Sequence, residues 1–534
     1  MIVMLTMTTL AFGQSKDSLV QLPNIILITS DQLIPHLMGT YGHPVVNTPN
    51  LDKLATSGIV FNAAYTPNPI CAPARACLMT GQYSTHIKVW DNAAPLSSDE
   101  PTIGHYLSLR DYESVLSGKM HFVGPDQLHG YDKRLIPNIY PADFVWTKDR
   151  FKKIPGSHAQ AYEAAAIRIV PEGTDLSPGP SGELAFKRPV FNFGSTMVVN
   201  SGFNETSHNS KFDKWAHFKA LDYLREKRAA IEQGADTRPF FLTISYNYPH
   251  EPFHPPLELY RMYENAPVDL PALPDTLDPC YSAMDKWLNQ HHGLETTQVK
   301  DPESIQKVRR AYYALVTYVD IVVGEIMKCL AENNFDKNTL IIFTSDHGDM
   351  LMEKGMVQKR SFYEWSSRIP LIVKFPDEAH AGMKINTPVS LIDVLPTILD
   401  VAQIPDSVRL RMDGKSLLPL IEKGEDASRY VISEMHSEGV YAPCFMVRKG
   451  DFKYIYIHGY ESQLFNLKDD PGEWKNLIYD KKYAPLVTRL REVIFQHFDP
   501  EEIETALQHS IGSRQLIQQW IEKTGTSWDY VPKE

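Results

Sequence analysis

The sequence predicts an α/β fold: a large mixed, mostly parallel sheet flanked by helices, followed by a smaller C-terminal antiparallel α+β domain. Short apolar runs alternate with helical patterns over most of the chain. After about residue 425 the runs become shorter and are separated by turns, as in an antiparallel sheet. At 534 residues the chain is long enough for two domains.

Five apolar runs are the candidate strands of the large sheet. They are almost continuous in Ile, Leu, Val and Phe, as strands buried on both faces are. The runs cover residues 24–29, 114–116, 239–245, 339–344 and 370–375. Between them, the capping sequence Asp301-Pro302 predicts a helix over 304–333. Segment 387–402 is expected to begin as a strand and to continue as a helix.

The last part of the chain predicts a separate subdomain. Its candidate strands are residues 430–435, 444–448, 452–458 and 463–466, and a helix over 483–497 is followed by more helix to about Lys523. We therefore expect a large domain over 20–424 and a C-terminal subdomain over 425–534. Residues 150–215 and 253–300 are rich in Pro, Gly, Ser and Asn, a composition typical of lids and binding loops.

Composition narrows the class of protein. The chain is 43% hydrophobic and 22% charged, which is ordinary for a globular protein. The net charge of −12 and the lack of a basic tract argue against nucleic acid as a partner. Five cysteines do not form a disulfide scaffold over this length, and no segment is apolar and long enough to span a membrane. Residues 1–14 are expected to be the remnant of a signal peptide, with a disordered N-terminus as the alternative.

A cysteine motif opens a short predicted helix. Cys71 is followed by proline two residues later and arginine four residues later, and then by Thr80-Gly81. Proline suits a first helical turn and Gly81 suits a helix end, so Cys71 is expected at the positive end of a helix with Arg75 on the same face. A lone cysteine here would be interpreted as a buried structural residue. The full pattern C-x-P-x-R-x-x-x-x-T-G instead resembles the type I sulfatases, in which this cysteine is oxidised to formylglycine.

Further polar residues follow the predicted strands at their carboxyl ends, where sites form in parallel α/β sheets. Singly, each of them has an ordinary interpretation as a helix cap or a surface residue. Together, and in this order, they resemble the sulfatase family across nearly the whole chain. These residues are Asp31 and Gln32, Lys119 and His121, His250, and Asp346 and His347.

The resemblance implies a metal site. Asp31, Gln32, Asp346 and His347 would bind one divalent cation together with the formylglycine oxygen. Calcium is usual in the family and suits oxygen ligands, while the His347 nitrogen leaves magnesium or manganese open. Many family members have aspartate where this chain has Gln32, a change that puts the identity and affinity of the metal in doubt.

The resemblance also implies roles in the reaction. Arg75, Lys119 and Lys359 would clamp the sulfate group, and the hydrated aldehyde from Cys71 would attack the sulfur atom. The remaining roles concern protons and sulfate binding. His250 and Lys359 would lie on the leaving-group side, where one of them protonates the departing alcohol. His121 would take the proton that allows sulfate to leave, and Asn92 is a further candidate sulfate ligand.

The substrate is less clearly defined. The segments at 89–94, 118–131 and 139–146 resemble the choline sulfatases, where a tryptophan matching Trp146 helps to hold a quaternary ammonium group. After Trp146 this similarity fades, and the expected export fits a sulfated saccharide, which we favour, with choline-O-sulfate as the alternative. The candidate sugar contacts are His86, His254, His208 and Arg360, each of which also fits an ordinary solvated loop.

Further expectations concern alternative functions, partners and location. A phosphonate or phosphate ester hydrolase with the same nucleophile is a related alternative, and a catalytically inactive glycan-binding protein is an alternative of a different class. A formylglycine-generating maturase is the expected protein partner, and a homo-oligomer stays open. Export to a bacterial periplasm is the expected location.

Overall fold

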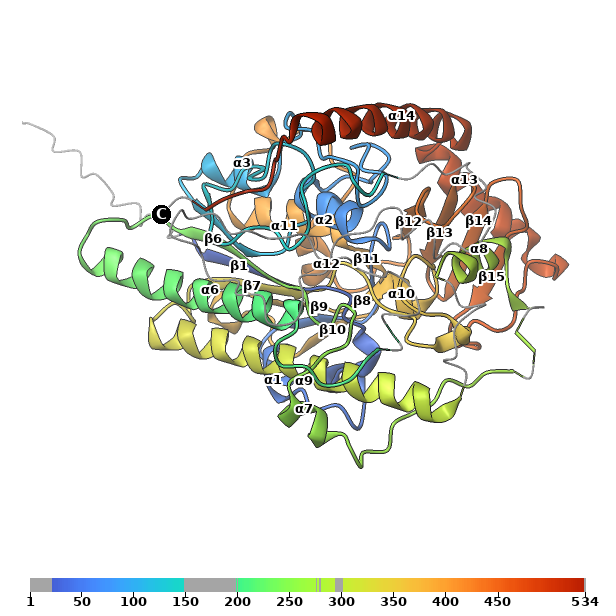
Figure 1. Ribbon diagram of the computed structural model, residues 1–534, viewed down its shortest axis with the longest axis horizontal. Helices are drawn as coiled ribbons and strands as arrows, with labels where there is room; N and C mark the ends of the chain where they lie inside the picture. The colour runs from blue at the N-terminus through green and yellow to red at the C-terminus, as the bar shows by residue number, and fades with distance from the viewer. Residues whose placement is uncertain are drawn as a thin grey trace, which may run out of the picture.

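The large sheet is the centre of the molecule (Figure 1). The computed structural model describes residues 22–147, 198, 200–274, 276–277, 280–292 and 301–532. The expected signal remnant at 1–14 and most of the polar segment 150–215 lie outside the described residues. Eight strands run in the order β10-β2-β9-β7-β1-β6-β4-β5. They are β1 (Asn24–Ser30), β2 (Ile59–Phe61), β4 (Glu113–Gly118), β5 (Lys133–Arg134), β6 (Phe240–Tyr246), β7 (Thr339–Thr344), β9 (Leu371–Lys374) and β10 (Met383–Ile385).

The central strands are parallel and in register. Leu27 of β1 lies opposite Thr243 of β6 on one side and Ile342 of β7 on the other. Strand β9 is antiparallel to both β7 and β2, which makes the sheet mixed. The predicted mixed, mostly parallel sheet is confirmed, and the carboxyl ends of β1, β4, β6 and β7 meet at one edge.

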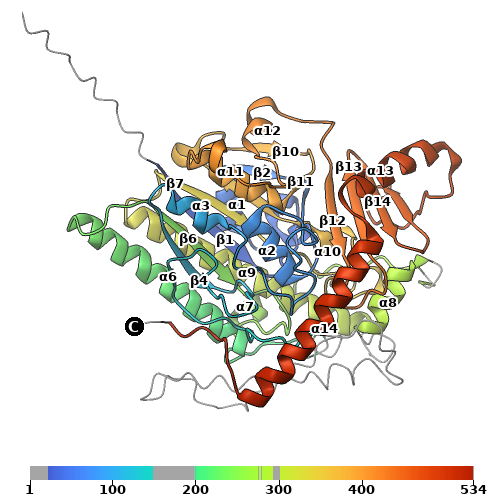
Figure 2. The same cartoon turned by 90° about the horizontal axis from the view of Figure 1, so that it is seen from above.

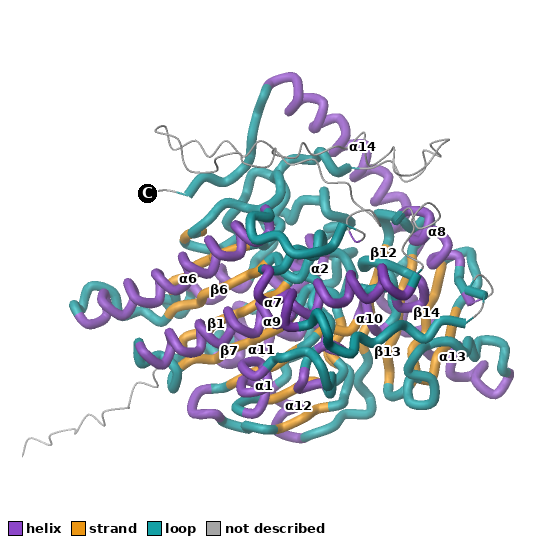
Figure 3. Tube along the Cα trace, turned by 60° about the horizontal axis from the view of Figure 1, so that its bottom comes forward, coloured by secondary structure: helices purple, strands orange, loops and turns teal. Residues whose placement is uncertain are grey.

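Helices cover both faces of this sheet. Helices α1 (Pro49–Thr56), α6 (His208–Glu232) and α9 (Pro302–Glu332) pack in one apolar cluster with side chains of the sheet. Helices α2 (Cys71–Thr80), α3 (Ile103–Ser108) and α11 (Val394–Val401) contribute to a second cluster on the other face. Figure 1 shows the two groups of helices on opposite sides of β6, β1 and β7, and Figure 3 shows α6 and α9 running beside these strands.

Three helices lie wholly or partly in polar segments that were predicted to be irregular. Helix α6 begins at His208, and α7 (Leu257–Met262) and α8 (Ala283–His291) lie within 253–300. Serine caps start two of them, since Ser207 accepts from the backbone N–H of Ser210 and Ser282 accepts from that of Asp285. The expectation of irregular chain was therefore wrong at these positions, because solvent-facing helical surfaces share the polar residues of loops.

Two smaller sheets complete the molecule. The first has three short strands in the order β11-β3-β8, formed by β11 (Val389–Ser390), β3 (Ala64–Tyr65) and β8 (Arg368–Ile369). The second is the predicted C-terminal antiparallel sheet, whose strands are β12 (Val431–Met435), β13 (Cys444–Lys449), β14 (Phe452–Ile457) and β15 (Gln463–Asn466). Helix α13 (Ala484–His497) contacts β13 and β14, and α14 (Pro500–Thr524) extends from this region across the main body (Figure 2).

Within the described ranges, no helix is long and apolar enough to cross a membrane.

Candidate active site

Cys71 is the first residue of the buried helix α2. The preceding Ile70 is extended, and its carbonyl accepts the backbone N–H of Ala74 at 3.0 Å. The helix ends at Gly81, which has a φ of 66° in the left-handed region that favours glycine. Cys71 is only 1% exposed. The predicted cysteine at the positive end of a helix is therefore what the structure contains.

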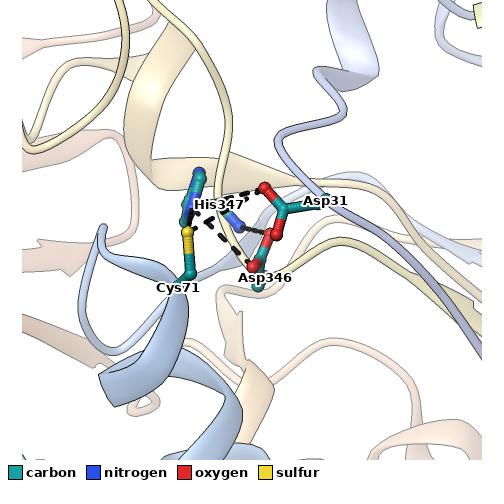
Figure 4. A group of neighbouring side chains, drawn as sticks. All are labelled: Asp31, Cys71, Asp346 and His347. Atoms are coloured by element: carbon teal, nitrogen blue, oxygen red, sulfur yellow. Dashed lines mark hydrogen bonds and ion pairs between the residues drawn. The ribbon is translucent and has the colours of Figure 1, made fainter. Parts of the chain in front are cut away.

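Four ligand-type side chains converge on this helix end (Figure 4). Cys71 Sγ lies 3.2 Å from His347 Nε2 and 3.9 Å from Asp31 Oδ1. His347 Nε2 is 3.7 Å from Asp346 Oδ2, and one ligand atom from each of the four residues lies within 4.8 Å of the others. They come from the ends of β1 and β7 and the start of α2. Two carboxylates, an imidazole and a sulfur or oxygen donor fit a divalent cation.

Hydrogen bonding prepares this group for a cation. His347 Nδ1 lies 3.0 Å from the carbonyl of Gly348, so an N–H at Nδ1 leaves the Nε2 lone pair facing the carboxylates. Burial is the main cause that lowers the pKa of His347, which favours the neutral ligand form. Burial opposes ionisation of Asp31, but Lys119, His250 and Arg75 outweigh it and hold the pKa of Asp31 well below its usual value.

Arg75 connects the two carboxylates. Its Nε and Nη2 donate to Asp346 Oδ2 and Asp31 Oδ2, each at 2.9 Å. Nη1 donates to the carbonyl of Lys119 at 2.6 Å and to Ser245 Oγ at 2.8 Å. All three nitrogens of this 1%-exposed guanidinium are thus engaged by the protein. Its direct task in this structure is to neutralise and orient the carboxylates, while the sulfate clamp stays a prediction.

Lys119 and His121 follow β4 at the same edge. Lys119 Nζ lies 2.5 Å from Asp31 Oδ2 and 3.4 Å from Tyr140 Oη. His121 is buried, and neither ring nitrogen has a hydrogen-bond partner among the described residues. Burial, followed by the charge of Lys119, lowers the pKa of His121 well below its usual value, so the ring is neutral. A neutral imidazole whose ring nitrogens make no hydrogen bond to the described residues is suited to accept a proton in this position.

His250 and Lys359 contact each other. His250 Nδ1 lies 2.7 Å from the carbonyl of Glu251, so an N–H at Nδ1 leaves Nε2 to accept from Lys359 Nζ at 2.8 Å. Burial disfavours the charge of Lys359, but Cys71, Glu251 and Asp31 outweigh it and raise the pKa of Lys359. Lys359 and His250 are therefore joined by a hydrogen bond from Nζ to Nε2.

Gln32 lies beside the metal-type group but is directed elsewhere. Its Oε1 accepts from Lys359 Nζ at 2.7 Å. Its amide nitrogen donates to Glu251 Oε2 at 2.5 Å and also to Asp349 Oδ2. The side-chain carbonyl is thus occupied by a lysine, so Gln32 positions Lys359 here, and its role as a metal ligand stays a prediction.

The predicted substrate contacts fall into two groups. Asn92 reaches the site, because its Oδ1 accepts the backbone N–H of Ala72 at 3.0 Å. Trp146 belongs to an aromatic group, with ring centroids 5.4 Å from His121 and 4.9 Å from Tyr140. Arg360 follows Lys359 directly in the chain and pairs with Glu438 at 2.8 Å.

Three histidines do not join the Cys71 group through any contact among the described residues. His86 Nδ1 is 2.6 Å from Asp413 Oδ2, and its ring stacks on Phe498. His254 Nε2 lies 3.1 Å from the carbonyl of Asn200. His208 is the first residue of α6 and is half-buried.

Helix α14 contacts two segments that carry predicted substrate contacts. Arg514 pairs with Asp91 through two bonds of 2.6 and 2.9 Å, next to the residue that contacts the start of α2. Gln518 Oε1 accepts the backbone N–H of Phe144 at 3.0 Å, two residues before Trp146. The C-terminal helix therefore contacts the two segments that carry the predicted substrate contacts Asn92 and Trp146.

Several contributors were missed from the sequence. Tyr140, Ser245, Asn247, Glu251, Asp349 and Glu438 all contact predicted site residues. Tyr140 lies in the segment 139–146, Glu251 follows His250, and Asp349 lies two residues after His347. Ser245 belongs to β6 and Asn247 follows it, so adjacency in the sequence was the available signal. Glu438 had none, because it belongs to a turn of the other subdomain.

Comparison with known proteins agrees with this geometry. The Sulfatase family matches residues 23–404, and the C-terminal region of N-sulphoglucosamine sulphohydrolase matches residues 352–499. The choline-sulfatase of Rhizobium meliloti (strain 1021) is 34% identical over 520 residues, covering 96% of this chain and 94% of that protein. The arylsulfatase of Clostridium perfringens (strain 13 / Type A) is 28% identical, covering 90% and 95%.

Solved structures agree on the fold. The phosphonate monoester hydrolase of Agrobacterium radiobacter superposes with a TM-score of 0.65 at 22% identity, covering 89% of this chain and 95% of that one. A protein in complex with its substrate D-glucosamine-2-N,6-O-disulfate superposes with a TM-score of 0.64 at 22% identity, covering 92% and 99%. The predicted resemblance is confirmed: the chain belongs to the sulfatase family of sulfuric ester hydrolases.

Proposed function

We propose that the protein hydrolyses sulfate monoesters with a formylglycine formed from Cys71 and with one divalent cation, Ca²⁺ in the first instance. The observation that carries this proposal is the convergence of Cys71 with Asp31, Asp346 and His347 at the start of α2. When bound, the cation supplies Lewis acidity to the sulfate oxygens, and the hydrated form of the modified side chain supplies the nucleophile. Mg²⁺ and Mn²⁺ are the alternatives for the cation.

The chain's own groups perform the proton transfers. Lys359 donates to His250 Nε2 at 2.8 Å, so this pair can deliver one proton to the departing alcohol oxygen. Neutral His121 accepts the proton whose removal releases sulfate. The buried charges of Lys119 and Arg75 offset the negative charge that gathers around the sulfate group.

The test of this proposal combines mass spectrometry with kinetics. Protein from the native host is expected to give a peptide in which residue 71 has the mass of an aldehyde, and to release sulfate from 4-nitrophenyl sulfate. Cys71→Ala is expected to lose this activity. An unmodified thiol in material that is fully active, or equal activity in Cys71→Ala, would contradict the proposal. A catalytically inactive glycan-binding protein would instead show neither the aldehyde nor sulfate release.

For the substrate, we propose choline-O-sulfate first, although the sequence alone favoured a sulfated saccharide. The aromatic group of Tyr140, Trp146 and His121 lies beside Lys119 at the site, and such rings suit a quaternary ammonium. The relative from Rhizobium meliloti, similar over nearly its whole length, supports this order.

A sulfated saccharide is the second candidate, because a cavity of about 530 Å³ lies beside the predicted sugar contact His254. Its lining includes the exposed ring of Phe203 together with Asn200, Asn204 and Glu205, side chains that suit a sugar. Sulfate release from choline-O-sulfate and from defined sulfated oligosaccharides separates the two. Turnover of saccharides alone would reverse the order, and a preference for aryl phosphonate over aryl sulfate esters would favour a phosphonate hydrolase.

Other expectations from the sequence stay proposals. We propose that a formylglycine-generating maturase acts on the chain, that the protein is exported to a periplasm, and that a boundary near residue 424 separates the catalytic domain from the C-terminal subdomain. A homo-oligomer stays open. Fractionation of the native host and light scattering of the purified protein test location and oligomeric state.

A further inference from the structure

Arg360 and Glu438 form a buried ion pair beside the predicted sulfate ligand Asn92. Arg360 Nη2 lies 2.8 Å from Glu438 Oε2, and the two side chains are only 5% and 8% exposed. Glu438 Oε1 accepts the backbone N–H of Asn92 at 2.6 Å, and its Oε2 accepts the side-chain amide at 3.3 Å. Because Asn92 contacts the backbone of Ala72 at 3.0 Å, a short chain of hydrogen bonds connects the ion pair to the residue after Cys71.

The protein holds this pair in a fixed geometry. Arg360 has a φ of 82° and Glu438 a φ of 49°, both in the left-handed region that non-glycine residues rarely adopt. The backbone N–H of Arg360 donates to the carbonyl of Pro69 at 3.2 Å. Behind Glu438, a Cβ at Gly439 would lie 2.7 Å from His291 Cγ, so α8 packs tightly on the turn. Strained residues that are held from several sides are typical of functional sites.

The charges near Cys71 indicate what the pair does. Lys119, Lys359 and Arg75 bring three positive charges to the site, and the carboxylates of Asp31 and Asp346 offset part of the charge of Lys119 and Arg75. Arg360 would add a fourth, which would attract a second anionic group on the substrate. Glu438 cancels this charge at 2.8 Å, in a buried setting where screening by solvent is weak.

We propose that the Arg360–Glu438 pair is a specificity determinant that disfavours sulfate esters whose alcohol part carries a second negative charge. This inference rests on the proposed sulfatase function and deepens it. Substrates with a neutral or cationic alcohol part are accepted because they meet no net charge at this position. An anionic alcohol part would have to displace Glu438 from Arg360.

The experiment uses variants that unbalance the pair in opposite directions. Glu438→Gln keeps an acceptor for Asn92 and leaves the charge of Arg360, whereas Arg360→Gln leaves the charge of Glu438. The double variant removes both charges. Glu226→Gln, an exposed position on α6, is the matched control for net charge. The substrates are 4-nitrophenyl sulfate, choline-O-sulfate and a glucosamine carrying two sulfate groups.

The readout is kcat/KM for each charged substrate divided by that for 4-nitrophenyl sulfate. Glu438→Gln is expected to raise this ratio for the disulfated sugar about tenfold and to lower it for choline-O-sulfate, while Arg360→Gln does the reverse. The double variant returns both ratios toward the wild-type values. A merely structural role would lower all activities together and leave the ratios unchanged, and this result would overturn the inference.

A binding measurement keeps the inference testable without turnover. Disulfated glucosamine is expected to raise the melting temperature of Glu438→Gln more than that of the wild type or of Glu226→Gln. Equal shifts in all three proteins would refute the inference. If wild-type protein that contains the aldehyde released sulfate from no substrate, the proposed function would be refuted instead. The melting shifts measure binding only and do not depend on turnover.

Discussion

Replacing Arg75 with methionine tests whether this residue neutralises the carboxylates of the proposed metal site, Asp31 and Asp346. Arg75 is 1% exposed and donates to Asp31 and Asp346 at 2.9 Å each. Removing one partner of a buried ion pair costs about 3–5 kcal/mol. At about 2.1 cal/mol/K per residue, unfolding of 534 residues as one unit carries an entropy near 1.1 kcal/mol/K, so the melting temperature should fall by about 3–5 °C without added cation.

The same replacement is expected to strengthen cation binding. The guanidinium repels a divalent cation that the carboxylates attract, so Arg75→Met should bind Ca²⁺ about tenfold more tightly, equivalent to about 1.4 kcal/mol. Isothermal titration calorimetry measures this affinity. Sulfate release should still fall by about 10²–10³-fold, because an oriented positive charge is lost from the site.

Arg134→Met is the matched control for this prediction. Arg134 is equally buried, but its hydrogen bonds run to the carbonyl groups of Ile136, Gln127 and Gly118 and to the side chain of Gln127. Its loss should lower the melting temperature and leave the Ca²⁺ affinity unchanged. If Arg75→Met bound Ca²⁺ no more tightly than the wild type, the assignment of Arg75 to the carboxylates would be refuted.

Three further predictions follow. Burial raises the pKa of Asp213 to about 7, and its carboxyl group accepts the backbone N–H of Asn247 at 2.7 Å. Because the folded pKa lies above the unfolded value, stability is lost as pH rises from about 4 to 7. The melting temperature of the wild type relative to Asp213→Asn should therefore fall across that range, and a constant difference would contradict this. Arg514→Met breaks the buried pair with Asp91 and should cost about 3–5 kcal/mol and raise KM for choline-O-sulfate, whereas an unchanged KM would separate α14 from the site. Because burial lowers the pKa of His121, the wild-type rate should show no loss from protonation of this residue between pH 6 and 7, and His121→Gln should reduce kcat by about 10²–10⁴-fold. Steady-state rates across pH check both, and a wild-type acid limb at pH 6–7 that is absent in His121→Gln would contradict a neutral His121.

The long buried strands were predictable because their composition alone identifies them. Residues 339–344 were predicted as a strand and form β7, and 24–29 differs from β1 by one residue. The strands of two or three residues, such as β3 and β8, are too short to show any periodicity. The direction of β9 was also not predictable, since an apolar run looks the same in parallel and antiparallel pairings.

Site residues that directly follow predicted strands could be predicted from the sequence. Contacts between side chains of different elements could not. Asp31, Lys119, His250 and Asp346 could be found because each stands just past a strand that ends at one edge of the sheet. Their partners could not be assigned in this way. That Gln32 accepts from Lys359, rather than pointing only at a cation, depends on two carboxylates that hold its amide nitrogen. The direction of this side chain depends on tertiary packing, which the order of residues in the sequence does not show.

The contact between Asp91 and Arg514 also sets an order of events during synthesis. The two residues are 423 positions apart, and their contact joins α14 to the segment that carries Asn92. At about 5–20 residues per second, a ribosome needs roughly 20–85 s to pass from one partner to the other. During that interval Cys71 has been made, but the helix that contacts Asp91 has not. If the maturase that we propose acts during synthesis, it meets residue 71 before the contact between α14 and Asp91 can form.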